Sequence, residues 1–261
     1  MSEPTVLLTN DDGIDSPGIA ALYEALQAVA EVTVVAPSSD RSAIGRALSG
    51  SADVHDHQWG YALDGTPSDC VVAGLEALVP EADIVVSGCN KGANLGMYVL
   101  GRSGTVSAAV EAAFFDVPAV AASLYVKQGD ADFQTLELET GEYRIAAEAT
   151  THLVEEGLES GVFEHTDYLN MNAPRPGDFG GGMTVTRPSE AHAMTAHRDG
   201  HTVHLEDLMW RQMAHGEVPD GEEATDRRAV ADGAVSVSPL TAPHTTEPHD
   251  ALDRVVAGFS R

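Results

Sequence analysis

Short apolar runs alternate with amphipathic stretches along most of this 261-residue chain. The runs have the continuous apolar centres of strands that are buried on both faces of a parallel sheet. Strands are predicted at residues 5–9, 31–36, 83–87, 118–124 and 167–171, and helices from residue 17, from residue 67, at 104–115 and at 141–156. This order of elements predicts an α/β fold with a mostly parallel sheet.

Two of the helices have clear start signals. Ser16 and Thr66 stand at N-cap positions, and each is followed by a proline, Pro17 or Pro67, at the first helical position. These signals predict where the two helices begin.

The pattern changes after Pro174. Glycines at 180–182 and short alternating runs such as 202–205 predict a β-hairpin or an extended arm, while the charged segment 217–228 is expected to be mobile. A late strand at 235–237 and a terminal helix at 250–259 complete the prediction. We expect a core over residues 1–174 and an arm over 175–261 that takes part in oligomerisation and partly returns to the core.

Two adjacent carboxylates, Asp11 and Asp12, follow the first predicted strand directly. Ligands of parallel sheets bind at the carboxyl ends of the strands. Since two neighbouring carboxylates repel each other unless a cation lies between them, the pair predicts a site for Mg²⁺, Mn²⁺ or Ca²⁺. The alternative is structural, with Asp11 as a turn residue and Asp12 as an acid at a helix start.

Other polar side chains follow the second and third predicted strands. Ser42, Asn90 and Asn94 would converge with the acids at one edge of a doubly wound sheet. The segment 103–105, Ser-Gly-Thr at a helix start, offers backbone N–H groups and hydroxyls to an anion such as phosphate. A cation beside an anion site predicts phosphoester hydrolysis. Simpler roles remain open: Ser42 and Ser103 as caps, and both asparagines as turn residues.

The charge of the chain is extreme. Asp and Glu number 41 against 14 Lys and Arg, a net charge of −27, yet 43% of residues are hydrophobic. An ordered protein with this charge is expected to come from a salt-adapted source, because molar salt screens the repulsion. Duplex nucleic acid is excluded as a partner, since it requires basic contacts to phosphate.

Several other classes are not supported. No apolar run is long enough to span a membrane, and the acidic N-terminus lacks the pattern of a signal peptide, so a cytoplasmic protein is expected. Cys70 and Cys89 are expected to be reduced core thiols. Phosphate-loop, dinucleotide and zinc-protease motifs are absent. The histidines are expected at a surface or interface, with zinc binding as the alternative: His192, His197, His201 and His204.

Five ordered motifs together resemble the SurE family of 5′/3′-nucleotidases. They are Asn10-Asp11-Asp12-Gly13 with Ser16-Pro17-Gly18, Val35-Ala36-Pro37 before Arg41-Ser42, the segments 65–70 and 87–96, and Ser103-Gly104-Thr105-Val106. The resemblance continues weakly through 169–174 and 235–240.

The resemblance implies a Rossmann-like, three-layer αβα domain that binds one divalent ion, Mg or Mn. The implied metal ligands are Asp11, Asp12, Ser42 and Asn90, and the implied phosphate-pocket residues are Asn94, Ser103, Gly104 and Thr105. The implied activity is release of phosphate from nucleoside monophosphates, with polyphosphate as a further substrate of some members. Asp11, Asp12 and Asn94 would be catalytic, and the chain would form a homodimer or homotetramer through exchanged C-terminal arms.

Attack by a metal-activated water is the expected mechanism. An aspartyl-phosphate on Asp11, or a non-catalytic nucleotide or phosphate sensor, are the alternatives. Three positions depart from the family pattern: Arg102 replaces an aromatic residue, Thr241 stands at a family histidine position with His244 three residues later, and Cys89 replaces isoleucine. No general acid follows from this sequence.

The stability of the folded chain should rise steeply with salt. The Debye length falls from about 10 Å at roughly 0.1 M to about 3 Å at roughly 1 M, so crowded surface carboxylates repel each other far less. Thermal melts in low and molar KCl measure the effect. An unchanged melting temperature would show that the acidic composition is incidental.

Overall fold

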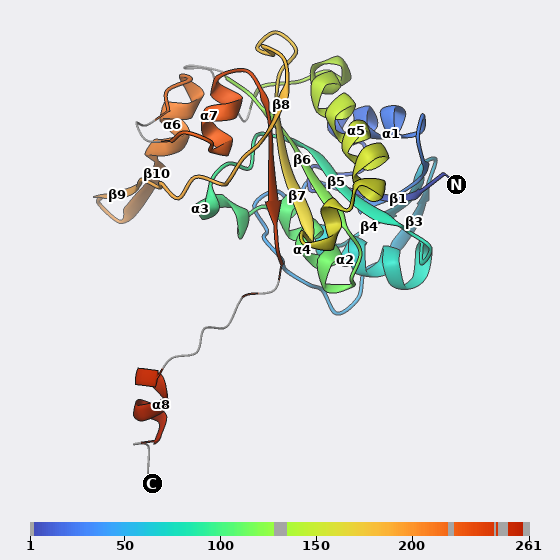
Figure 1. Cartoon of the computed structure of the whole chain (residues 1–261). Coiled ribbons are helices and arrows are strands. Elements are labelled where there is room, and N and C mark those ends of the chain that lie inside the picture. Colours follow the sequence, from blue (N-terminus) through green and yellow to red (C-terminus); the bar gives the residue numbers. More distant parts are fainter. Residues whose placement is uncertain (1–2, 128–134, 219–221, 243, 245–249, 258–261) are drawn as a thin grey trace.

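The computed structural model describes residues 3–127, 135–218, 222–242, 244 and 250–257 (Figure 1). Its centre is a nine-stranded sheet in the order β3-β4-β2-β1-β5-β6-β7-β11-β8. The six strands from β4 to β7 in this order are parallel, whereas β3 is antiparallel to β4 and β11 is antiparallel to β7. The predicted α/β fold with a mostly parallel, doubly wound sheet is confirmed.

The strands of this sheet are β1 (Thr5–Thr9), β2 (Glu31–Pro37), β3 (Val54–His57), β4 (Gly60–Leu63), β5 (Ile84–Lys91), β6 (Ala119–Tyr125), β7 (Tyr168–Pro174), β8 (Met183–Val185) and β11 (Val235–Leu240). The α-helices of the core are α1 (Pro17–Leu26), α2 (Pro67–Ala73), α3 (Met97–Leu100), α4 (Gly104–Phe114) and α5 (Arg144–Ser160). Short irregular helices cover Gly74–Leu78, Thr140–Tyr143 and Val162–Glu164.

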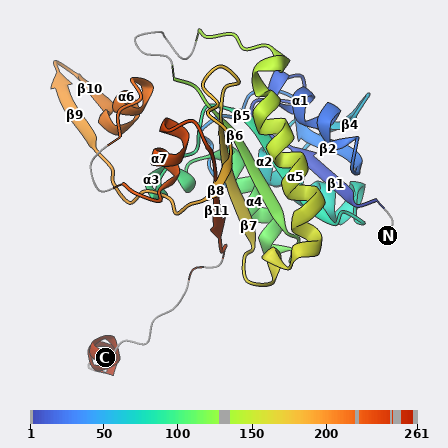
Figure 2. The same ribbon diagram turned by 45° about the horizontal axis from the view of Figure 1, so that its top comes forward.

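Helices cover both faces of the sheet, which gives three layers (Figures 1 and 2). Alternate residues of β1 serve the two layers: Val6 and Leu8 pack with α1 and α5, and Leu7 packs with α2 and α4. All three side chains are fully buried. The period of two along a strand therefore builds both cores from one apolar run.

The capping predictions hold for one helix and differ for the other. Thr66 accepts a hydrogen bond from the Asp69 N–H and Asp69 accepts one from the Thr66 N–H, which forms a capping box. Ser16 precedes α1 without a side-chain cap bond; its hydroxyl accepts a hydrogen bond from the Asn10 amide instead.

The third strand is longer than predicted, because β5 continues to Lys91 where a loop was expected. The register shifts between Ser87 and Asn90, and Asn90 then pairs with Ser123 of β6. Gly88 allows this path: its φ is +142°, and a Cβ there would lie 2.2 Å from the Ala122 carbonyl oxygen. Strand pairing therefore fixes the backbone of Asn90, which was expected to lie in a loop.

The C-terminal third adds a hairpin and two helices beside the sheet (Figure 2). The elements are β9 (Met194–Asp199), β10 (Thr202–Asp207), α6 (Leu208–Ala214) and α7 (Asp226–Ala231), and the terminal helix α8 covers Asp250–Ala257. Residues 258 and 259 of the predicted terminal helix lie outside the described part. β8 and β11 lie within the central sheet.

The expectation of a mobile segment at 217–228 is wrong for its described end, while 219–221 lie outside the described residues. Asp226 and Arg227 are buried in α7. The Asp226 carboxylate accepts hydrogen bonds from the backbone N–H groups of Gly96, Ser189 and Arg227 at 2.7–3.0 Å. The prediction of mobility failed because the hydrogen-bond partners of Asp226 lie far away in the sequence.

Among the described residues we find no helix with the length and the apolar composition that crossing a membrane requires.

Candidate active site

The turn after β1 is fixed by Asn10, which is fully buried. Its amide nitrogen donates hydrogen bonds to the Gly13 carbonyl and to the Ser16 hydroxyl, both at 2.8 Å. The side chain thus bridges the two ends of the acidic turn. As a result Asp11 and Asp12 project from a rigid turn at the carboxyl edge of the sheet.

Asp11 is buried against the start of α4. Its Oδ1 accepts a hydrogen bond from the Thr105 hydroxyl at 2.7 Å. Its backbone carbonyl accepts one from the Arg41 N–H at 2.7 Å, which ties the loop carrying Ser42 to the same turn. Burial is the main reason that the pKa of Asp11 is raised, and the hydrogen bond from Thr105 opposes the shift.

Asp12 is half-buried, and its Oδ2 accepts the Lys91 N–H at 2.8 Å. Burial and then repulsion from Asp11 raise the pKa of Asp12 to about 7. Both acids are therefore held where their charged forms are disfavoured. A divalent cation between them would reverse that effect, so this electrostatic arrangement suits one.

Ser42 lies at the exposed edge of the site. Its backbone N–H and hydroxyl both donate to Asp40 Oδ1, at 2.7 and 2.6 Å. The negative charge of Asp40 also contributes to the raised pKa values of Asp11 and Asp12. Asp40 is thus a third acid near the pair. Its position in a polar loop gave no signal that it differed from other loop acids.

Asn90 stands at the end of β5, where its amide nitrogen donates to the Gly92 carbonyl at 2.5 Å. This bond orients the side chain and keeps its oxygen for other partners. Together, the Ser42 hydroxyl, the Asn90 side-chain oxygen and the two carboxylates form a set of hard oxygen donors. Such a set fits Mg²⁺ or Mn²⁺.

Asn94 is enclosed by a polar network from the neighbouring strands. Its side chain donates to the Ser123 hydroxyl at 2.9 Å, its N–H donates to Asn172 Oδ1 at 2.8 Å, and its carbonyl accepts from Asn170 and Asn172. The three partners are fully buried in β6 and β7. Sequence reasoning missed them as site residues; the available signal was polar residues in strands that are otherwise apolar.

The start of α4 adjoins the acids. Ser103 caps the helix by accepting the Val106 N–H at 3.1 Å, which is the simpler role left open above. Gly104 lies so close to Asp11 that a Cβ would be 2.8 Å from Asp11 Oδ2. The first backbone N–H groups of the helix have no partner within it. The helix start predicted to bind an anion therefore lies directly against Asp11 of the carboxylate pair.

A cavity of about 400 Å³ opens over these groups. It is lined by Asp11, Ser42, Ala43, Asn90, Lys91, Ala93, Asn94, Val99, Arg102, Ser103, Asp207 and Trp210. Asp12, Gly104 and Thr105 are not among these residues. Asp12 contacts the Lys91 backbone, while Gly104 and Thr105 contact Asp11. The predicted residues therefore either line this cavity or contact a residue that does.

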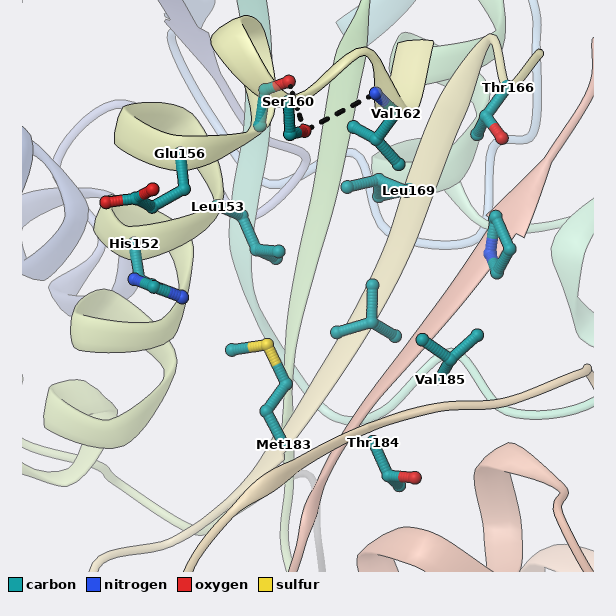
Figure 3. A pocket seen from close by; sticks show the side chains of 13 residues that line it. His152, Leu153, Glu156, Ser160, Val162, Thr166, Leu169, Met183, Thr184 and Val185 are labelled. Carbon is teal, nitrogen blue, oxygen red and sulfur yellow. Dashed lines mark hydrogen bonds between the residues drawn. The ribbon is translucent and has the colours of Figure 1, made fainter.

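A larger cavity of about 560 Å³ lies elsewhere, between α5 and the strands β7, β8 and β11 (Figure 3). Its wall is mostly apolar, with Leu153, Leu169, Met183 and Val185 among its side chains. It shares no lining residue with the cavity over the acids. The larger cavity is lined by none of the predicted site residues, so we take the smaller, polar cavity as the candidate site.

Zinc binding by the histidine cluster gains no support. No group of three or more His, Cys, Asp or Glu residues within the described ranges is placed to hold a metal. His197 stacks on His204 across β9 and β10, with ring centroids 4.9 Å apart, and His192 stacks on Tyr98. Thr241 and His244 are exposed and do not line the candidate site.

Comparisons with known proteins agree with each other. Residues 6–195 match the family described as survival protein SurE. Proteins named 5′-nucleotidase SurE from Haloarcula marismortui and Halobacterium salinarum are 60% and 59% identical, covering 99% and 98% of this chain and 96% and 98% of their own lengths. The crystal structure of SurE protein from Aquifex aeolicus is similar with a TM-score of 0.75 at 33% identity, covering 93% of this chain and 95% of that one.

Gly104→Ala should disrupt the carboxylate pair without weakening α4. The added methyl group would overlap the Asp11 side chain, while alanine is a better helix former than glycine. We expect Mn²⁺ affinity, measured by calorimetry, to fall about 10- to 100-fold, as for displaced supports of metal ligands. Gly101→Ala is the control, because a Cβ there meets nothing within 4 Å. Equal affinities of the two variants would contradict the assignment of Asp11 to the metal site.

Proposed function

This chain belongs to the survival protein SurE family, and we propose that it is a 5′-nucleotidase, a divalent-metal-dependent phosphatase of nucleoside monophosphates. The resemblance seen in the five motifs is confirmed by the match over residues 6–195. The expected salt-adapted source is also supported, since the similar proteins reported above come from halophilic archaea.

The observation that carries the proposal is the contact between Asp11 and the start of α4. The Thr105 hydroxyl donates to Asp11 Oδ1, and Gly104 packs against the same side chain. A phosphate bound at the helix start would thus lie beside the carboxylate pair.

Asp11, Asp12, Ser42 and Asn90 would hold one Mg²⁺ or Mn²⁺ ion. When bound, such an ion supplies a nucleophile by lowering the pKa of water, and it neutralises phosphoryl oxygens. The protein residues supply position: Asn10 fixes the turn, and the Lys91 N–H fixes Asp12.

Asn94 and Ser103, which line the cavity, would contact the phosphate, while Gly104 and Thr105 would contribute through the helix start that they form. Of the N–H groups at the start of α4, that of Val106 is bonded to the Ser103 hydroxyl and that of Thr105 to Asp11, so the Gly104 N–H would be the preorganised donor that stabilises developing negative charge. Asn94 lines the cavity, and its enclosure by Ser123 and Asn172 fixes its orientation. Lys91 and Arg102 add positive charge to the cavity wall of a chain that has very little.

Removal of the metal tests this proposal. EDTA should abolish phosphate release from AMP, and Mn²⁺ or Mg²⁺ should restore it. Asp12→Asn should lower turnover about 100-fold or more, because several kcal/mol of transition-state stabilisation depend on the cation. The metal-free variant should melt no lower than the parent, since the charge that it removes is disfavoured by burial.

Asp15→Asn is the matched control, because Asp15 lies in the same turn with its side chain 87% exposed. Full activity in a metal-stripped sample would refute the metal site. Binding of AMP without turnover would support a sensor instead.

We also propose that the chain forms a homodimer or homotetramer through its C-terminal arm. The β9–β10 hairpin is exposed, and one of its faces groups four apolar residues with two charged ones, because Leu205 pairs with Ala196, Val203 with Arg198 and Asp207 with Met194. Leu205 is 74% exposed. Met209, in the helix that follows the hairpin, is already buried within the chain and gives no reason for association. The hairpin face is the better support.

Leu205→Asp should reduce the mass measured by light scattering in molar salt, because a charge among the four apolar residues opposes association. Leu48→Asp, which changes an exposed leucine outside the hairpin, should leave the mass unchanged. A full-length chain that is monomeric under these conditions would contradict the proposal. We further propose a cytoplasmic location, which suits the buried free thiols of Cys70 and Cys89.

A further inference from the structure

One part of the cavity wall has no direct contact assigned to it in the proposed ion and phosphate sites, although Arg102 within it contributes positive charge. Asp11, Asn90, Asn94 and Ser103 account for the ion and the phosphate. The remaining wall includes Val99, Arg102, Asp207 and Trp210. These residues come from α3, from the turn before α4, and from the end of β10 with α6.

Trp210 is half-buried and is fixed at the cavity by the packing of α6. Asp207 caps this helix by accepting the Trp210 N–H at 3.0 Å. One turn later Met213 is almost fully buried, and its carbonyl accepts the Tyr125 hydroxyl at 2.5 Å. Trp210 also packs against the small core that contains Met213, Leu95 and Tyr125. The Trp210 indole is therefore held at the cavity by α6, which packs against Leu95 and Tyr125 from the N-terminal half of the chain.

Arg102 is exposed but is also held in place. Its guanidinium carbon lies 4.0 Å from the centre of the Tyr98 ring. Its Nε and Nη2 both donate to the Tyr98 carbonyl, at 3.3 and 3.1 Å. A planar cation is thus fixed beside the cavity, next in sequence to Ser103.

We propose that Trp210 and Arg102 form a subsite for the nucleobase of the substrate, a deduction that rests on the proposed nucleotidase function. Indole and guanidinium planes both stack on bases, and stacking tolerates different bases because each has a π-face. Val99 adds apolar contact area, and the cavity volume is within the range of small-molecule sites. The C-terminal third then determines substrate affinity, through α6, as well as assembly.

The fluorescence of Trp210 tests the contact directly. The chain has two tryptophans. Trp59 does not line the cavity; it lies between β3 and β4 and stacks on Tyr23. Trp59→Phe therefore leaves Trp210 as the only indole. With Mn²⁺ present, AMP should quench its emission saturably, whereas ribose 5-phosphate should not. An emission unchanged by saturating AMP would overturn the proposal.

Kinetics separate recognition of the base from a structural role. Trp210→Ala should raise the KM for AMP about tenfold, the loss expected for one stacking partner, and change the KM for ribose 5-phosphate less than about twofold. Trp210→Phe should recover most of the affinity for AMP. Equal losses for AMP and ribose 5-phosphate would mean that Trp210 only supports the fold. If the wild-type protein releases phosphate from neither compound, the proposed function fails, while the fluorescence titration still tests the subsite.

Discussion

The close approach of α4 to the turn after β1 is the constraint on which the site depends. The Thr105 hydroxyl bonds to Asp11, and the helix begins with the one residue, glycine, that fits against that carboxylate. The contact joins residues 94 positions apart and links the acidic turn, where we propose the cation, to the helix start, where we propose the phosphate. It also fixes the distance between them, because both elements are packed into the same core layer by Leu7 and Val106.

The site is assembled against an electrostatic cost. Asp11 and Asp12 are held together with raised pKa values, and Asp40 adds to the repulsion. The surrounding structure tolerates this because uncharged hydrogen bonds hold the framework: Asn10 in the turn, and Ser123, Asn170 and Asn172 around Asn94. The network is not complete, because the buried oxygens Asn10 Oδ1 and Asn170 Oδ1 have no hydrogen-bond partner in the described structure, and each unsatisfied atom adds to the cost of the site. The repulsion that opposes the metal-free fold is the same property that suits it to a cation.

The sequence predicted the local elements well and the distant contacts poorly. The periodicity of 5–9, 31–36 and 118–124 was sufficient for β1, β2 and β6, because strands buried on both faces are marked by continuous apolar residues. The short strands β3 and β4 were missed: β3 is a largely exposed edge strand, and β4, although it lies between β3 and β2, has only two buried residues, so neither has a long apolar run. The acids, Asn90 and the start of α4 could be placed at one sheet edge by the rule for parallel strands. The roles of Asp226 and Trp210 could not, because each depends on a partner or a cavity wall that only the tertiary fold provides.

The position of β11 has a consequence for the order of folding. It lies inside the sheet, between β7 and β8, although it is formed by Val235–Leu240 near the end of the chain. Asp226, just upstream, holds the Gly96 N–H across 130 residues of sequence. During synthesis the early strands can pair, but the loop at the cavity lacks this support until nearly the whole chain has left the ribosome. Contacts of such long sequence separation form slowly. An unfinished or C-terminally shortened chain would therefore hold its acidic turn in an incomplete frame, and the fold makes completion of the polypeptide a condition for a finished active site.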